Sequence, residues 1–186
     1  MALTPSNSFP KGAKAPDFML PDTVTKNHYS LSDIQGEKGT VVLFICNHCP
    51  FVIHVNEELV KLANEYQPKG IGFVAISSND VVNYPQDSPD KMKLHAEENN
   101  YPFPYLYDDS QEVAKAYDAA CTPDIYLFDG DLKKYYHGQL DDSRPGNDKP
   151  VTGADLRNAL DLLLGNKPFS GREMPSMGCN IKWKVS

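Results

Sequence analysis

Apolar residues follow two different periods in the first third of the chain. Residues 41–45 form an unbroken apolar run rich in β-branched side chains, which predicts a buried strand. After Pro50, apolar residues recur at steps of three and four as far as Tyr66, the spacing of one buried helix face. Pro50 suits the first turn of such a helix. The pattern therefore predicts a strand that leads directly into a helix, with residues 46–49 at the junction.

The rest of the chain alternates between the same two kinds of pattern. Two helix starts carry local capping signals: Asp109 with Glu112 forms a capping box, and Thr152 with Asp155 caps the last helix. Asp129-Gly130 between two apolar runs is a strong hairpin signal. The further elements that we expect are a hairpin over 16–31, strands at 72–77, 105–107, 125–128 and 133–137, and helices at 88–99, 109–117 and 152–164.

This order predicts an α/β fold with a mixed sheet flanked by helices. The early strand–helix–strand units require parallel pairing, and the closing hairpin adds antiparallel strands. We assign residues 1–164 to one domain, in which 1–14 form an N-terminal extension. Residues 165–186 show no period and are expected to be a tail packed on or near that domain.

Composition excludes several classes of partner. The net charge of −7 and the pI near 5.1 argue against nucleic acid and anionic membranes as partners. No apolar run approaches the roughly 20 residues of a membrane helix, and residues 1–14 contain no apolar block typical of a signal peptide. Four cysteines in such a chain point to the reducing cytoplasm, where paired thiols are more often catalytic than structural.

The junction itself reads Cys46-Asn47-His48-Cys49. Unpaired N–H groups at the start of a helix favour thiolate over thiol, and two cysteines three residues apart on a first turn can close a disulfide. We therefore expect a redox site, with Cys46 as the exposed nucleophile and Cys49 as the buried resolving thiol. His48 either stabilises the Cys46 thiolate or is an exposed spacer. The redox-active disulfide needs no bound cofactor, and no second pair of ligands is present for a structural zinc.

Several motifs together resemble the thioredoxin fold and, within it, a peroxiredoxin-like subgroup of the AhpC/TSA redoxins. The resemblance implies that the Thr122–Pro123 bond is cis, lies against the dithiol, and presents backbone to an extended substrate. The motifs are the CxxC junction with Pro50-Phe51-Val52, the opening Gly12-x-x-Ala15-Pro16-Asp17-Phe18-x-Leu20-x-Asp22, Cys121-Thr122-Pro123-Asp124, Asp141-Asp142-Ser143-Arg144-Pro145-Gly146-Asn147 and Gly178-Cys179-Asn180-Ile181-Lys182-Trp183-Lys184.

Departures from the family pattern separate the candidate activities. Peroxidatic sites carry a Thr and an Arg that bind the peroxide; with Cys49 as the reactive cysteine, the Thr position holds Cys46 and the Arg position falls near Pro123. Peroxidase chemistry is therefore the weaker interpretation. The buried Asp of typical thioredoxins is replaced by Thr40, which leaves Cys49 without its usual proton acceptor.

The roles of two further cysteines and of one arginine remain open. The fold would bring Cys121 near the dithiol, either as a third thiol or as a small buried apolar residue. Cys179 in the tail presents the same choice, and the buried apolar role is favoured there. Arg144 lies among acidic residues in a turn-rich segment that predicts a self-paired surface loop.

We interpret the chain as a cytoplasmic thiol–disulfide oxidoreductase. Cys46 attacks a disulfide of a protein or small molecule, Cys49 resolves the mixed disulfide, and an external dithiol donor resets the pair. One alternative is a thiol peroxidase of the antioxidant peroxiredoxin type. The other is a metal or iron–sulfur binding protein that uses Cys46, Cys49 and Cys121. The sequence leaves the substrate, the direction of electron flow and the oligomeric state open.

Overall fold

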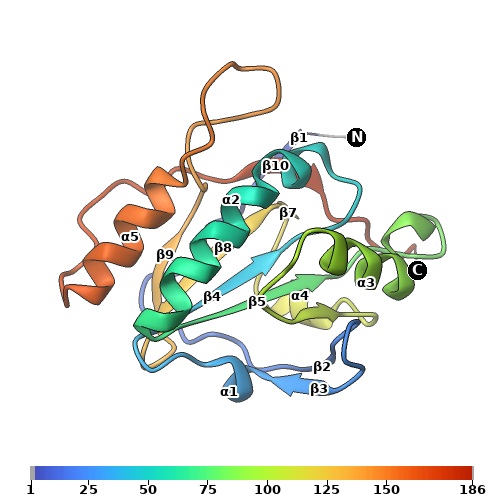
Figure 1. The fold of residues 1–186 in the computed structure, drawn as a ribbon, viewed down its shortest axis with the longest axis horizontal. Helices are drawn as coiled ribbons and strands as arrows, with labels where there is room; N and C mark the ends of the chain where they lie inside the picture. Colours follow the sequence, from blue (N-terminus) through green and yellow to red (C-terminus); the bar gives the residue numbers. More distant parts are fainter. Residues whose placement is uncertain (1–2, 186) are drawn as a thin grey trace.

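A five-stranded mixed sheet forms the centre of the computed structural model, which describes residues 3–185 of the chain. The strand order is β6-β5-β4-β8-β9 (Figure 1), with parallel pairing of β4 to β5 and of β5 to β6, and antiparallel pairing of β4 to β8 and of β8 to β9. The predicted mixed sheet is thus confirmed. The strands are β4 (Gly39–Phe44), β5 (Ile71–Ser77), β6 (Tyr105–Tyr107), β8 (Asp124–Asp129) and β9 (Lys134–His137).

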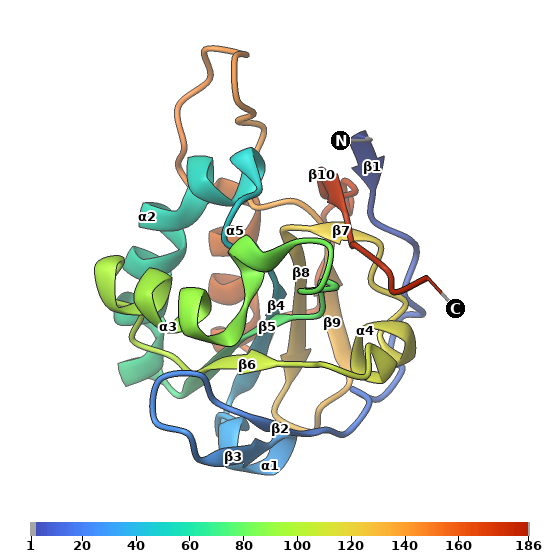
Figure 2. The ribbon, with the colours of Figure 1, turned by 90° about the vertical axis from the view of Figure 1, so that its right-hand side faces the viewer.

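Alternation along β4 divides the core into two layers. Val41 and Leu43 pack with α2, α3 and α5, whereas Val42 and Phe44 pack on the other face with α1 and α4. Figure 2 shows α2 and α5 on one side of the sheet and α4 on the other. The helices are α1 (Leu31–Ile34), α2 (Pro50–Tyr66), α3 (Pro89–Glu98), α4 (Glu112–Ala116) and α5 (Ala154–Leu164), with 3-10 turns η1 (Gln67–Lys69) and η2 (Pro85–Asp87).

A second, three-stranded sheet joins the two ends of the chain. Its order is β1 (Leu3–Pro5), β10 (Met177–Asn180) and β7 (Cys121–Thr122), all antiparallel. The sequence predicted none of these strands, because each has four residues or fewer and none shows a period. The predicted N-terminal hairpin is present as β2 (Met19–Pro21) paired with β3 (His28–Ser30). The extension and the tail therefore pair with each other and with the segment that precedes Pro123.

Neither predicted capping residue occupies the N-cap position, although the Thr152 hydroxyl accepts the Ala154 N–H at 3.3 Å at the start of α5. Gln111 and Gly153 are the N-cap residues of α4 and α5, both in the left-handed region and without a side-chain cap bond. At the start of each of these helices, a buried aspartate from the preceding segment accepts a backbone N–H. Asp108 accepts a hydrogen bond from the Ala114 N–H at 3.0 Å, and Asp141 accepts one from the Gly153 N–H at 2.7 Å. A carboxylate near a helix N-terminus is favourable wherever in the sequence it originates.

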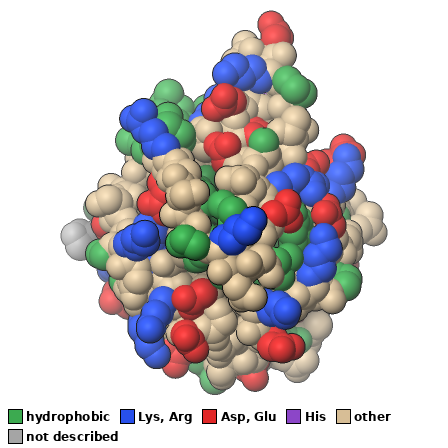
Figure 3. All heavy atoms as spheres, turned by 90° about the vertical axis from the view of Figure 1, so that its left-hand side faces the viewer, with side chains coloured by type: hydrophobic (Ala, Val, Ile, Leu, Met, Phe, Trp, Pro, Cys, Tyr) green, Lys and Arg blue, Asp and Glu red, His purple; other side chains and the backbone are tan. Residues whose placement is uncertain are grey.

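The surface carries charges of both signs. On the side of the molecule where α5 lies, basic and acidic side chains are interspersed (Figure 3). The segment between β9 and α5 projects beyond the rest of the fold (Figure 1). Within residues 3–185, no helix has both the length and the apolar character needed to cross a lipid bilayer.

Strand β10 packs against β7 so closely that Gly178 has no room for a side chain. A Cβ atom there would lie 1.9 Å from the Thr122 carbonyl oxygen, a backbone atom that cannot turn aside. We expect Gly178→Ala to lower the free energy of unfolding by about 1–3 kcal/mol, the usual cost of overpacking, as measured by urea unfolding. Gly165→Ala is the matched control, because its nearest neighbour would lie 3.3 Å away. Equal unfolding midpoints for the two variants would contradict the close packing.

Candidate active site

The CxxC motif forms a loop between β4 and α2, and both cysteines precede the helix. Helix α2 begins at Pro50, and Cys49 is its N-cap residue in an extended conformation. The prediction that both thiols lie on the first helical turn is therefore wrong. Pro50 explains the difference, because proline favours the first helical position and an extended residue before it. Cys49 is thus the thiol nearer to the positive end of the helix dipole.

Both motif sulfurs are buried. Cys46 is 1% exposed and Cys49 is fully buried, so the prediction of an exposed Cys46 is wrong. Cys46 Sγ lies 3.5 Å from Thr122 Oγ1 and 4.0 Å from His48 Nδ1. The His48 side chain keeps 18% of its surface exposed. Of these two contacts of Cys46 Sγ, Thr122 is buried and His48 is partly exposed.

Thr122 contacts both thiols of the motif. Its bond to Pro123 is cis, which confirms the geometry that the resemblance implied. Its hydroxyl contacts Cys46, and its carbonyl oxygen lies 3.2 Å from Cys49 Sγ. In the register of the second sheet, Thr122 is paired with Cys179 of β10. The pairing edge that the resemblance assigned to an extended substrate is therefore filled by the chain's own tail.

A third sulfur reaches the dithiol, and it belongs to Cys179. Its Sγ lies 2.8 Å from Cys49 Sγ, and the residue is 3% exposed. Cys121, the third thiol suggested by the sequence, precedes Thr122 on β7, and successive side chains of a strand point to opposite faces. Its Sγ lies 3.7 Å from the Pro123 carbonyl oxygen. The sequence favoured a buried apolar role for Cys179, because nothing in an aperiodic tail indicates where it folds back.

A buried carboxylate that the sequence analysis missed stands beside Cys46. Asp87 in η2 is fully buried, and its Oδ2 lies 2.6 Å from His48 Nδ1. Its Oδ1 accepts the Asn47 N–H at 2.9 Å, and Asn79 donates to Oδ2 at 2.8 Å. The ring nitrogen of His48 nearest to the thiol is therefore held by a carboxylate. Only the fold brings Asp87 to the motif, and no local signal marks it.

These contacts place the negative charge of the dithiol on Cys49. Side-chain hydrogen bonds with Cys46 first, and then with Cys179 and the Thr122 hydroxyl, lower the pKa of Cys49 to about 5 in spite of its burial. The same hydrogen bond to Cys49, together with burial and the Asp87 charge, raises the pKa of Cys46. Burial and the neighbouring Cys49 raise the pKa of Cys179 to about 12. The sequence analysis assigned the thiolate to Cys46, and that assignment is reversed.

Three of these groups could hold a metal ion. The ligand atoms of Cys46, His48 and Asp87 lie within 4.8 Å of one another, and they form the one such group found in residues 3–185. The set differs from the one that the sequence suggested, in which Cys49 and Cys121 join Cys46. His48 and Asp87 already bond to each other, and Asp87 accepts two further hydrogen bonds. A metal would have to displace the His48–Asp87 contact.

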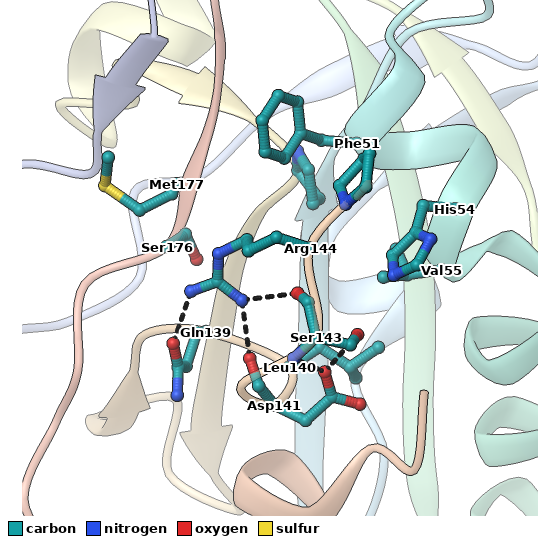
Figure 4. A pocket seen from close by; sticks show the side chains of 12 residues that line it. Phe51, His54, Val55, Gln139, Leu140, Asp141, Ser143, Arg144, Ser176 and Met177 are labelled. Atoms are coloured by element: carbon teal, nitrogen blue, oxygen red, sulfur yellow. Dashed lines mark hydrogen bonds between the residues drawn. The ribbon is translucent and has the colours of Figure 1, made fainter. Parts of the chain in front are cut away.

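A hollow of about 290 Å³ opens beside Phe51 and Pro123 (Figure 4). Arg144 lines it and, as expected for a self-paired loop, donates to the carbonyl oxygens of Asp141 and Ser143 at 2.7 and 2.6 Å. It also donates to Gln139 Oε1. The guanidinium is therefore hydrogen-bonded within its own loop.

Comparisons with known proteins show the family of the chain. The sequence model of the AhpC/TSA family matches residues 11–135. The thiol–disulfide oxidoreductase ResA of Geobacillus thermodenitrificans is 30% identical over 134 residues, which cover 69% of this chain and 70% of that protein.

Solved structures support the same fold. An uncharacterized conserved protein from Geobacillus kaustophilus is 60% identical, with a TM-score of 0.98, over 100% of this chain and 98% of that one. The thioredoxin domain of a thiol–disulfide oxidoreductase from Bacteroides vulgatus is 23% identical, with a TM-score of 0.66, over 84% of this chain and 99% of that one. The latter likeness confirms the thioredoxin-like fold.

The distribution of charge in the dithiol can be measured directly. We expect the reduced protein to develop thiolate absorbance with a midpoint at a pH of about 5, because Cys49 ionises there. Removal of the Cys46 hydrogen bond in Cys46→Ala should move this midpoint upward. Cys121→Ala is the control and should leave it in place. A wild-type midpoint near the ordinary thiol value of about 8.5 would contradict the assignment.

Asp87 should hold back the ionisation of Cys46. In a Cys49→Ala background, Asp87→Asn removes a negative charge that raises the pKa of Cys46, so alkylation of Cys46 by iodoacetamide at neutral pH should become severalfold faster. Mass spectrometry of the Cys46 peptide follows the reaction. Asp109→Asn removes an exposed carboxylate that is bonded to Lys184 and serves as the control. An equal or slower rate in the Asp87 variant would exclude this electrostatic role.

Proposed function

The chain belongs to the AhpC/TSA family, and from this premise we propose that it is a thiol–disulfide oxidoreductase whose working pair is Cys46 and Cys49. One observation carries the proposal: the sulfurs of Cys46 and Cys49 are both buried and both contact Thr122, whose bond to Pro123 is cis, and the pKa of Cys49 is lowered to about 5. A thiolate at neutral pH beside a second thiol is the requirement for disulfide exchange. The likeness to ResA, a named thiol–disulfide oxidoreductase, supports the same activity.

Cys46 makes the first attack, because its sulfur contacts His48, whose side chain is partly exposed to solvent. Cys49 holds the negative charge and accepts the Cys46 hydrogen bond, so it serves as the base. The Cys46 proton moves to Cys49 as Cys46 Sγ bonds to one sulfur of the substrate disulfide. The other substrate sulfur leaves as a thiolate.

Cys49 then resolves the mixed disulfide. It gives its proton to the departing thiolate, attacks Cys46 Sγ, and releases the remaining substrate sulfur, which takes up a proton from water. The products are two substrate thiols and the Cys46–Cys49 disulfide. An external dithiol donor then supplies two electrons and one proton, which restore the Cys46 thiol and the Cys49 thiolate, and its second proton goes to solvent.

The wider setting forms part of the proposal. The substrates are thiols and disulfides of proteins or small molecules, the exchange takes place in the cytoplasm, and no bound cofactor takes part. The acidic composition and the paired thiols of the sequence support this setting. Cell fractionation with an antibody against the chain tests the location.

Peroxide reduction is the weaker candidate, and an antioxidant role depends on it. Rapid peroxide cleavage needs hydrogen-bond donors placed on the developing charge of the O–O bond. Arg144, the arginine that lines the neighbouring hollow, is engaged by Gln139, Asp141 and Ser143 of its own loop. The structure therefore favours disulfide over peroxide as the substrate.

Exchange should depend on both cysteines in different ways. We expect Cys46→Ser and Cys49→Ser to lower the rate of insulin disulfide reduction by roughly two orders of magnitude or more, because the pair acts as a unit. Cys49→Ser should accumulate a mixed disulfide through Cys46, which mass spectrometry detects. Cys46→Ser should accumulate none with insulin.

Two controls complete this experiment. Cys121→Ala should retain the wild-type rate, because its sulfur contacts the Pro123 carbonyl oxygen. Hydrogen peroxide in place of insulin should oxidise the reduced protein no faster than it oxidises a free thiolate. Rapid peroxide turnover that is lost in Arg144→Ala would replace the proposed function with a peroxidase.

A further inference from the structure

Cys179 is held beside Cys49 by its strand. The register of β10 pairs Cys179 with Leu3 on one side and with Thr122 on the other. Sγ of Cys179 lies 2.8 Å from Sγ of Cys49, whereas a disulfide bond measures about 2.05 Å. A shift of less than one ångström along this line would join the two sulfurs.

Contacts at both ends of β10 fix this position. Before the strand, the Ser176 hydroxyl donates to the Gly138 carbonyl oxygen at 2.7 Å. After it, the Ile181 N–H donates to the Ala120 carbonyl oxygen at 3.1 Å, and the Lys182 N–H donates to Asn79 Oδ1 at 2.8 Å. Gly178 allows the strand to lie directly on Thr122. A group confined in this way reacts with its neighbour without first losing conformational freedom.

Cys49 therefore has two thiol neighbours. Hydrogen bonds to Cys46 and to Cys179 both lower the pKa of Cys49. Cys46 comes from the loop after β4, and Cys179 comes from the C-terminal strand. A sulfur placed between two others can exchange its disulfide partner by the chemistry that the proposed function already requires.

We propose that Cys179 is a third redox thiol. It replaces Cys46 as the disulfide partner of Cys49 and so releases Cys46 as a thiol. This step rests on the proposed function. Cys179 Sγ attacks Cys49 Sγ, the Cys49–Cys179 bond forms, and the Cys46–Cys49 bond breaks. Cys46 leaves as a thiolate and takes up a proton, which balances the proton lost by Cys179. One disulfide is consumed and one is formed, so no oxidant or reductant enters.

The two disulfide isomers differ in what they present to a partner. In the Cys46–Cys49 form, the disulfide includes Cys46 Sγ, the sulfur that contacts the partly exposed His48. The Cys49–Cys179 form occupies Cys49 and leaves Cys46, the thiol to which the proposed function assigns the attack on substrate, reduced. The oxidised protein thus retains a substrate-facing thiol. The reverse attack of Cys46 on Cys49 restores the Cys46–Cys49 disulfide, which the external donor then reduces.

Oxidation of the purified full chain by one equivalent of diamide tests this relay. Samples are quenched in acid, labelled with N-ethylmaleimide, and mapped without reduction by mass spectrometry. We expect the wild-type protein to contain both the Cys46–Cys49 and the Cys49–Cys179 linkage, with a fraction of Cys46 labelled. In Cys179→Ala, Cys46 labelling in the oxidised protein should fall to background. In Cys46→Ala, the Cys49–Cys179 disulfide should form as the main product.

The outcomes separate the relay from the proposed function. If Cys49 and Cys179 stay reduced in oxidised Cys46→Ala, and the wild-type protein yields only the Cys46–Cys49 linkage with normal insulin turnover, the relay is wrong and the proposed function stands. If no Cys46–Cys49 linkage forms and insulin is not reduced, the proposed function itself fails. Cys121→Ala should give the wild-type pattern of linkages, and a Cys49–Cys121 linkage in the wild-type protein in place of Cys49–Cys179 would assign the third thiol to Cys121.

Discussion

Strand β10 reaches the dithiol only because Gly178 has no side chain. Its backbone lies where a Cβ atom would collide with the Thr122 carbonyl oxygen, and that same oxygen contacts Cys49. The pairing of β10 with β7 therefore holds Thr122 and Cys179 together, at the cis bond that joins Thr122 to Pro123. Burial of both motif sulfurs and the contact with a third sulfur accompany this pairing. The two chain ends, joined by β1 and β10, are thus part of the site.

Charge in the site is organised by residues on both sides of the motif. Asp87 faces Cys46 through His48 and raises the pKa of Cys46, whereas Cys49 receives hydrogen bonds and the positive end of the α2 dipole. Asn79 connects these parts, since its amide donates to Asp87 and accepts the Lys182 N–H of the tail. The tail is therefore hydrogen-bonded, through Asn79, to the carboxylate beside Cys46.

Periodicity was sufficient to predict the elements that build the central sheet. Helix α2 and strand β6 have the predicted bounds, and the mixed pairing of the sheet follows from the order of elements. The exposure of Cys46 and the location of the thiolate were predicted wrongly, because both depend on contacts between distant segments. Asp87 reaches the motif through a 3-10 turn, and Cys179 reaches it through a four-residue strand. Such short elements carry no period, so their partners are fixed only by tertiary packing.

The position of Cys179 gives the buried dithiol a physical rationale. A thiolate buried among apolar groups is costly, and Cys49 offsets this cost with hydrogen bonds from two thiols and a hydroxyl. The same contacts make each neighbouring thiol a partner for disulfide exchange. Because the stabilising donors are themselves sulfur nucleophiles, the arrangement that lowers the pKa of Cys49 also gives it two covalent partners. Stabilisation of the charge and the choice between disulfides thus arise from one set of contacts.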